Sequence, residues 1–267
     1  MNQLNHTIDA QRQFEIFDES QARIYLAAVY RLIDFFGWAD LTLTHASTRV
    51  PNSDCHFLIN PFGIKFNQIK ASDLVKLDFE SNIIGNNNQI TINPTGFIQH
   101  SSIYKSRPDI NTIIHAHTPY GVALSTLDSG LLYIDQAAMV FYDKIAYHDY
   151  DGLAVDHQEG KRIAEALGKD KLCLIQRNHG ITVCGQKIDD AFIYLYMLEF
   201  ACRTQILAMS TGAKLIQPSS EIVSSFSKQI DQFKQKLDVN PSTKKINSFG
   251  FKALINKLDR LDPSYRD

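Results

Sequence analysis

The chain has 267 residues, enough for one large domain with an extension or for two small domains. Hydrophobic residues make up 44% of it and charged residues 21%, with 27 basic side chains against 29 acidic ones. This balance is typical of a globular protein that buries a sizeable core. It argues against a disordered chain and against a general nucleic-acid binder, which would carry an excess of positive charge.

The sequence also favours a reducing compartment without a membrane. No apolar run reaches the roughly 18 residues of a spanning helix, and residues 1–13 lack the basic start and apolar core of a signal peptide. We therefore expect a cytoplasmic protein with no membrane partner. The four cysteines are too few and too scattered for a disulfide framework, and we expect them to be buried, reduced thiols.

The first third of the chain predicts one helix followed by short strands. Apolar residues at steps of three and four indicate an amphipathic helix over residues 20–36, ended by Gly37. Ser72 is expected to cap a short helical turn. β-branched residues between polar turns predict strands over residues 41–50, 56–60, 74–79 and 89–92.

From residue 95 onwards, helices and strands alternate. The expected helices cover residues 95–104, 119–127, 156–167 and 189–209, and the expected strands cover residues 111–117, 144–148, 171–175 and 180–183. This order predicts the α/β fold class, with a central, mostly antiparallel or mixed β-sheet flanked by helices.

The composition changes after Gly212, where serine, lysine and glutamine become frequent. Apolar residues at helical spacing return from Phe249 to the end of the chain. We therefore expect one domain over residues 1–212. Residues 213–267 are expected to form a helical extension, packed on that domain or on a neighbouring subunit.

The strongest local signal for chemistry is His115-Ala-His117. Residues two apart in a strand point to the same face, so both imidazoles can reach one metal ion. Taken alone, such a motif is a pair of hydrogen-bonded core histidines about as often as it is a metal site. A third histidine, His179, stands in the polar turn Arg177-Asn-His-Gly180, where Gly180 would let the backbone bend; alone it is more often a turn residue than a ligand.

The other notable histidines have structural interpretations when taken singly. His148 stands in a polar and aromatic cluster at the end of a strand, His45 in the first strand, and His100 in a helix. The serine-hydrolase G-x-S-x-G pattern and the dinucleotide-binding G-x-G-x-x-G pattern do not occur in the sequence, which weakens both of those functional hypotheses.

Several spaced motifs occur in one order along the chain. They are Thr44-His-Ala-Ser-Thr-Arg-Val50, Phe57-Leu-Ile-Asn-Pro-Phe-Gly63, Ile103-Tyr-Lys-Ser-Arg-Pro-Asp109, His115-Ala-His-Thr-Pro-Tyr120, Ile145-Ala-Tyr-His-Asp-Tyr-Asp-Gly152 and Arg177-Asn-His-Gly180. Together they resemble the class II aldolase/adducin family from about residue 20 to residue 210. Agreement of several motifs in order is far more specific than any single one.

The resemblance implies a three-layer α/β/α fold and a divalent metal ion held by His115, His117 and His179. Aldolases of this family use zinc or a similar ion as a Lewis acid, which polarises a carbonyl so that a neighbouring carbon–carbon bond breaks or forms through an enediolate. They are commonly cyclic tetramers with active sites between subunits, and the resemblance implies a homo-oligomer here as well.

The sequence departs from the aldolases at their catalytic acid/base. Those enzymes have a glutamate four residues before the helix histidine that corresponds to His100, and this chain has Gly96 there. Their phosphate-binding pairs correspond to Thr44-His45 and Pro94-Thr95, and an intersubunit tyrosine corresponds to a position near Asp135 or Gln136. Residues 93–97 instead resemble the adducin side of the family.

These departures define the remaining candidates. We expect another side chain to take over the role of the missing catalytic acid/base. The candidates are His100, Gln136, Tyr142 and His148, and His45 is a further one. The expected substrate-binding residues are His45, Asn60, Gly63 and Thr95, the last two offering one donor each.

The sequence thus predicts a divalent-metal-dependent lyase of the retro-aldol or decarboxylation type. Three neutral imidazoles leave the ion's charge uncompensated, which favours a small anionic carbonyl or carboxylate substrate that chelates it. Zinc is the first expectation, and manganese and iron remain open, as does redox chemistry. The alternative is a non-catalytic, adducin-like binding protein that keeps a structural metal site.

Overall fold

The computed structural model describes residues 18–85, 90–153, 155–237 and 248–267. Its centre is a seven-stranded sheet with the order β3-β2-β1-β4-β7-β6-β5. The bounds are β1 His45–Arg49, β2 His56–Ile59, β3 Val75–Asp78, β4 Thr112–Ala116, β5 Ile145–His148, β6 Cys173–Gln176 and β7 Gly180–Gly185. Neighbouring strands are antiparallel except β5 and β6, so the sheet is mixed, as expected.

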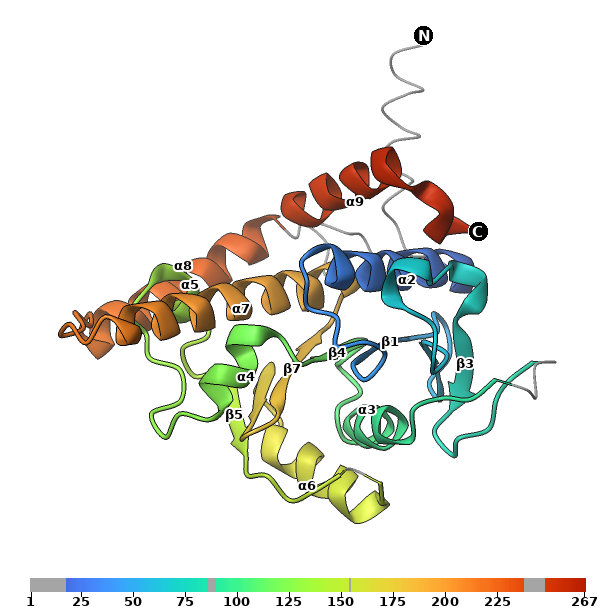
Figure 1. Ribbon diagram of the computed structural model, residues 1–267, viewed down its shortest axis with the longest axis horizontal. Coiled ribbons are helices and arrows are strands. Elements are labelled where there is room, and N and C mark those ends of the chain that lie inside the picture. The colour runs from blue at the N-terminus through green and yellow to red at the C-terminus, as the bar shows by residue number, and fades with distance from the viewer. Residues whose placement is uncertain (1–17, 86–89, 154, 238–247) are drawn as a thin grey trace, which may run out of the picture.

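Helices cover both faces of the sheet (Figure 1). One face carries α2 (Glu19–Phe35), α7 (Ile188–Ser210), α8 (Ser220–Leu237) and α9 (Phe249–Leu261), and the other carries α3 (Pro94–Ser106) and α6 (His157–Leu167). Each face has its own buried apolar cluster, which confirms the three-layer α/β/α architecture. Burial of these apolar faces is the main force that holds the layers together.

Local signals explain where the two helices beside the candidate site begin. Asn93 precedes α3 and accepts the backbone N–H of Thr95, while Pro94 takes the first helical position, where its missing N–H costs nothing. Asp156 precedes α6 in the same way and accepts the backbone N–H of Glu159. The packing of α3 against α6 fixes the side chains of both helices relative to the sheet.

Short helical segments complete the fold. They are α4 (Pro119–Ser125), α5 (Gln136–Met139), and the 3-10 turns Phe66–Gln68, Ala71–Asp73 and Pro263–Arg266. The helices α5 and α8 were not predicted as separate elements. α9 packs on α2 and α7, and α8 contacts α5. The division of the chain at residue 212 stays a prediction.

Four local expectations were wrong. The first strand begins at His45, because Leu41 has a φ of 49° and lies in a turn. Residues 90–92 form no strand, although two isoleucines there pack on the apolar cluster, and the rest of that expected strand lies outside the described residues. Lys70 rather than Ser72 precedes the helical turn. Cys55 is exposed, whereas the other three cysteines are buried.

Within the described part of the chain, no helix is both long and apolar enough to cross a membrane. The longest helix of that described part, α7, packs its buried apolar residues against the sheet and neighbouring helices, whereas Tyr196, Phe200, Leu207 and Met209 on its other side are exposed.

Candidate metal centre

The three predicted ligands meet at the end of two central strands. His115 belongs to β4 and His117 follows directly after it, while His179 lies in the turn that joins β6 to β7. Antiparallel pairing places β7 beside β4, with Thr182 opposite His115. The turn therefore returns His179 to the place where the other two imidazoles project.

The tight turn depends on two residues with special backbone demands. Asn178 has a φ of 57°, a left-handed conformation that asparagine tolerates better than most residues. Gly180 was expected to let the backbone bend, but the structure requires a glycine there because a side chain would not fit. A Cβ at that position would lie 2.8 Å from the carbonyl oxygen of Ala116 and 3.0 Å from Cδ2 of His117. Glycine thus lets the two strands approach closely beside the ligands.

The three imidazoles face one another through their Nε2 atoms. His117 Nε2 lies 3.0 Å from His115 Nε2 and 2.9 Å from His179 Nε2, and one ligand nitrogen from each residue lies within 4.8 Å of the others. Burial lowers the pKa of His115 well below its usual value and lowers the pKa of His179 to about 4, with neighbouring imidazoles adding to the effect. At neutral pH these two rings are therefore uncharged.

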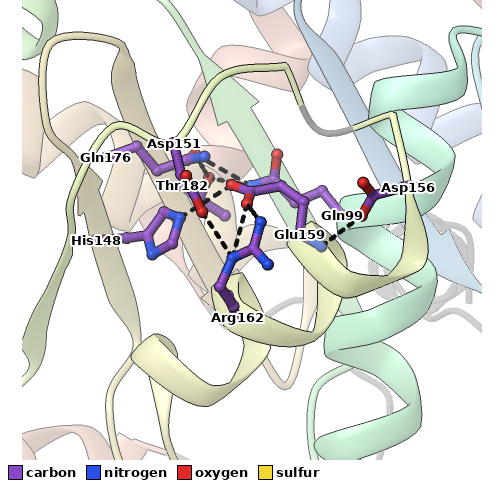
Figure 2. A network of polar contacts seen from close by, with 8 residues as sticks. All are labelled: Gln99, His148, Asp151, Asp156, Glu159, Arg162, Gln176 and Thr182. Carbon is purple, nitrogen blue, oxygen red and sulfur yellow. Dashed lines mark hydrogen bonds and ion pairs between the residues drawn. The ribbon is translucent and has the colours of Figure 1, made fainter.

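Buried hydrogen bonds decide which nitrogen of His115 carries the proton. Gln99, Gln176 and Thr182 form a network next to His115 (Figure 2). The Thr182 hydroxyl donates to Gln176 Oε1 at 2.9 Å and accepts from Gln99 Nε2 at 2.6 Å. Because its single proton is used, His115 Nδ1, at 3.0 Å, must be the donor to Thr182. The Nε2 atom of His115 is then left with a lone pair.

His117 is held in the same tautomer by a carboxylate. Its Nδ1 lies 2.9 Å from Oδ2 of Asp40, which accepts the N–H. In this tautomer the Nε2 atom of His117 presents a lone pair, as that of His115 does, and the two atoms lie 3.0 Å apart in the same small volume. Such a pair is repulsive unless a cation or a proton lies between the two atoms. Imidazoles oriented from behind by a hydroxyl and a carboxylate fit a divalent metal ion.

The histidines open into a cavity of about 420 Å³ between the sheet, α3 and the segment after β5. Its lining includes the three candidate ligands together with His45, Thr95 and His148. Among the predicted substrate-binding residues, His45 and Thr95 thus reach the cavity. The volume is suited to a small molecule.

The His45 ring occupies the space into which a side chain at position 96 would project. A Cβ on Gly96 would lie 2.7 Å from His45 Cδ2 and 2.8 Å from His45 Cγ, so the two positions compete for one volume. The His45 ring stacks on His115 with 4.9 Å between ring centroids, as expected from their pairing across β1 and β4. Its Nδ1 lies 3.0 Å from His100 Nε2.

His100 lies behind His45 rather than in the cavity lining. Its Nδ1 is 2.6 Å from the Ser47 hydroxyl, which in turn is 2.8 Å from the Tyr104 hydroxyl. Burial lowers the pKa of His100 to about 3, so the ring is neutral. This buried chain of polar groups fixes the orientation of His45.

A second polar network forms the wall around His148 (Figure 2). His148 Nε2 lies 3.0 Å from Oε1 of Glu159, a side chain that is only 6% exposed. Arg162 joins Glu159 at 2.6 Å and Asp151 at 2.7 Å. Glu159 therefore orients His148, as a carboxylate orients a catalytic histidine in many enzymes.

Other predicted residues lie elsewhere. Asn60 is buried and its Oδ1 accepts the Tyr30 hydroxyl at 2.7 Å. Gly63 lies beyond the cavity lining, which reaches its neighbour Phe62. Gln136 and Tyr142 belong to α5 and the turn after it, outside the lining of this chain's cavity. Their proposed roles stay untested.

Sequence reasoning missed the residues that support the histidines. Thr182 alternates with the apolar residues of β7, and this pattern would have placed it opposite His115 once strand pairing was known. Asp40, Gln99 and Glu159 lie far from their partners along the chain. Their roles became visible only from the three-dimensional arrangement.

The chain is thus an α/β protein in which three imidazoles that could hold a metal ion converge at the ends of the central strands. The family model described as Class II Aldolase and Adducin N-terminal domain matches residues 25–206, and the chain belongs to that family. Class II aldolases are typically dependent on a divalent metal, and members of the family are often oligomeric and act on small substrates.

Individual relatives agree with this assignment. An aldolase II superfamily protein from Pseudomonas syringae has a similar structure, with a TM-score of 0.83 and 38% identity over 94% of this chain and 96% of the other. The L-fuculose 1-phosphate aldolase of Glaciozyma antarctica is 27% identical, with a TM-score of 0.79 and 93% coverage of both chains. Mouse alpha-adducin is 41% identical over 73% of this chain but only 26% of its own length.

Proposed function

We propose that this protein is a divalent-metal-dependent lyase that cleaves a carbon–carbon bond in a small carbonyl or carboxylate compound. The observation that carries the proposal is the convergence of His115 and His117 Nε2 lone pairs, with both tautomers set by partners behind the rings. His179 supplies the third ligand. Family membership supports lyase chemistry of the retro-aldol or decarboxylation type.

A divalent ion held by these ligands supplies Lewis acidity, which draws electron density from a substrate carbonyl. The chain supplies proton transfer. We assign that role to His148, whose Nε2–H donates to Glu159 and whose Nδ1 then serves as the proton-accepting atom. His45 positions the substrate, and His100 positions His45.

Several finer properties belong to the same proposal. Zinc is the proposed metal, since neutral imidazole ligands and an open coordination position suit it. We propose a homotetramer in the cytoplasm. Residues 1–212 form the metal-site domain in this proposal, and residues 213–267 form a helical extension that packs on it or on a neighbouring subunit.

The proposal is tested by incubating the purified protein with 2-oxo acids, 2-hydroxy acids and phosphorylated ketoses, with and without a chelator. We expect one class to be cleaved only when metal is present, and His117→Ala to abolish that turnover. His157→Ala is the matched control, because His157 is exposed and lies outside the cavity lining. Cleavage that survives both chelation and His117→Ala would contradict the proposal.

The identity to mouse alpha-adducin favours a second candidate, a binding protein in which the histidines hold a structural metal. In that case the protein would co-sediment with actin filaments or with another partner. The histidine variants would then lower thermal stability without changing any turnover. Substrate cleavage that depends on His117 would decide against this candidate.

A further inference from the structure

The cavity has a charge distribution that bears on its substrate. Lysine and arginine are represented by Arg177 alone among the described residues that line the cavity. The Arg177 guanidinium is already engaged: it donates to the carbonyl oxygen of Leu127 at 2.5 Å and stacks over the Tyr147 ring, 4.5 Å from its centroid. These contacts hold the guanidinium against Leu127 and Tyr147, so only part of its donor set is left for a ligand.

Most hydrogen-bond donors at the start of α3 already have acceptors within the chain. Pro94 has no N–H, and the Thr95 N–H and hydroxyl both donate to Asn93 Oδ1, at 3.1 and 2.9 Å. The Asn93 carbonyl oxygen accepts the N–H of Phe97. Thr95 thus lacks the free donor that the sequence suggested.

The wall formed by the segment after β5 and by α6 is acidic. Asp149, Asp151 and Glu159 all line the cavity. Arg162 pairs with two of them, Asp151 and Glu159, which leaves three carboxylates against one guanidinium. A doubly charged phosphate would meet repulsion here, whereas a hydroxyl would find hydrogen-bond acceptors.

We propose that the cavity selects small 2-hydroxy or 2-oxo carboxylates that carry hydroxyl groups and no phosphate. The inference rests on the proposed metal site, where the metal ion would bind the carboxylate and balance its single negative charge. The acidic wall then receives the neutral, hydroxyl-bearing end of the molecule. Phosphorylated ligands bind more weakly because they bring a second anionic group to that wall.

Two ligands that differ only at the far end test the proposal: D-glycerate and 3-phospho-D-glycerate share one chelating 2-hydroxy carboxylate. Their binding to the zinc-loaded full chain is measured by isothermal titration calorimetry at constant ionic strength. We expect D-glycerate to bind at least tenfold more tightly, with its binding lost in chelator. Asp149→Lys should narrow or reverse the preference, while Asp170→Lys, at an exposed acid outside the lining, should leave it unchanged.

The outcomes separate this inference from the proposed function. Equal or tighter binding of the phosphorylated acid to the zinc-loaded protein overturns the substrate class and leaves the metal site intact. The substrate class is likewise overturned if zinc binds but neither acid does, or if Asp149→Lys and Asp170→Lys behave alike. A chain that takes up no zinc overturns the proposed function and this inference together.

Discussion

The competition between Gly96 and His45 for one volume yields a sharp prediction about Gly96→Ala. In an ordinary helix, alanine is up to about 1 kcal/mol more favourable than glycine. Here the added Cβ would lie 2.7 Å from His45 Cδ2, so the imidazole must move. It is confined by stacking on His115 and by its 3.0 Å contact with His100.

The expected magnitude follows from these terms. Overpacking a buried site costs about 1–3 kcal/mol, and loss of a buried hydrogen bond costs about 1 kcal/mol more. These costs exceed the gain in helix propensity, so Gly96→Ala should lower the free energy of unfolding by about 1–3 kcal/mol. When His45 is already alanine the clash is absent, and the same change should stabilise by up to about 1 kcal/mol.

The assay is urea unfolding followed by circular dichroism for the two single variants and the double variant. Gly250→Ala is the control, because Gly250 is also in a helix and an added Cβ there would lie 3.4 Å from Ile193 Cδ1, an ordinary contact. It should be neutral or stabilising. Equal stabilisation by Gly96→Ala with and without the His45 imidazole would refute the competition for one volume.

Three further predictions concern the groups behind the ligands. Thr182→Val should weaken zinc binding about 10–100-fold in calorimetry, because His115 loses the acceptor that fixes its tautomer, whereas Thr182→Ser should retain near-normal affinity. Asp40→Asn should weaken zinc binding by a similar factor through His117, and an unchanged affinity would argue against the orienting role of this carboxylate. Burial holds the pKa of His100 at about 3, so the folded state binds fewer protons than the unfolded state below about pH 6.5. The contribution of this group to the free energy of unfolding should therefore be complete above that pH. It should fall by up to about 1.4 kcal/mol per pH unit as the pH drops towards 3. His100→Asn should reduce that slope in unfolding experiments at several pH values.

Alternation of apolar and polar residues was sufficient to predict most of the sheet, and apolar spacing of three and four residues predicted its main helices. The H-x-H pattern at the end of β4 gave two candidate ligands, since strand geometry puts His115 and His117 on one face. The error at residues 90–92 has a clear cause: two isoleucines in alternation satisfy the strand pattern equally well when they only anchor a loop on the core.

What the sequence did not reveal depends on contacts between distant segments. Asp40 and Glu159 carry no local signal, because their roles come from His117 and His148, which the fold places beside them. Likewise, Gly96 looked like a simple loss of the acid/base. The structure shows that the His45 ring fills the space beside Gly96, which no single stretch of sequence could indicate.

The central claim is that the three Nε2 atoms bind one divalent metal ion. The most direct measurement is X-ray absorption spectroscopy of the zinc-loaded chain, combined with metal analysis of the same sample. We predict one zinc per chain with three imidazole nitrogens at about 2.0–2.1 Å, and loss of that signal in His115→Ala and His179→Ala. A spectrum that is unchanged in these variants, or dominated by sulfur ligands, would contradict the claim.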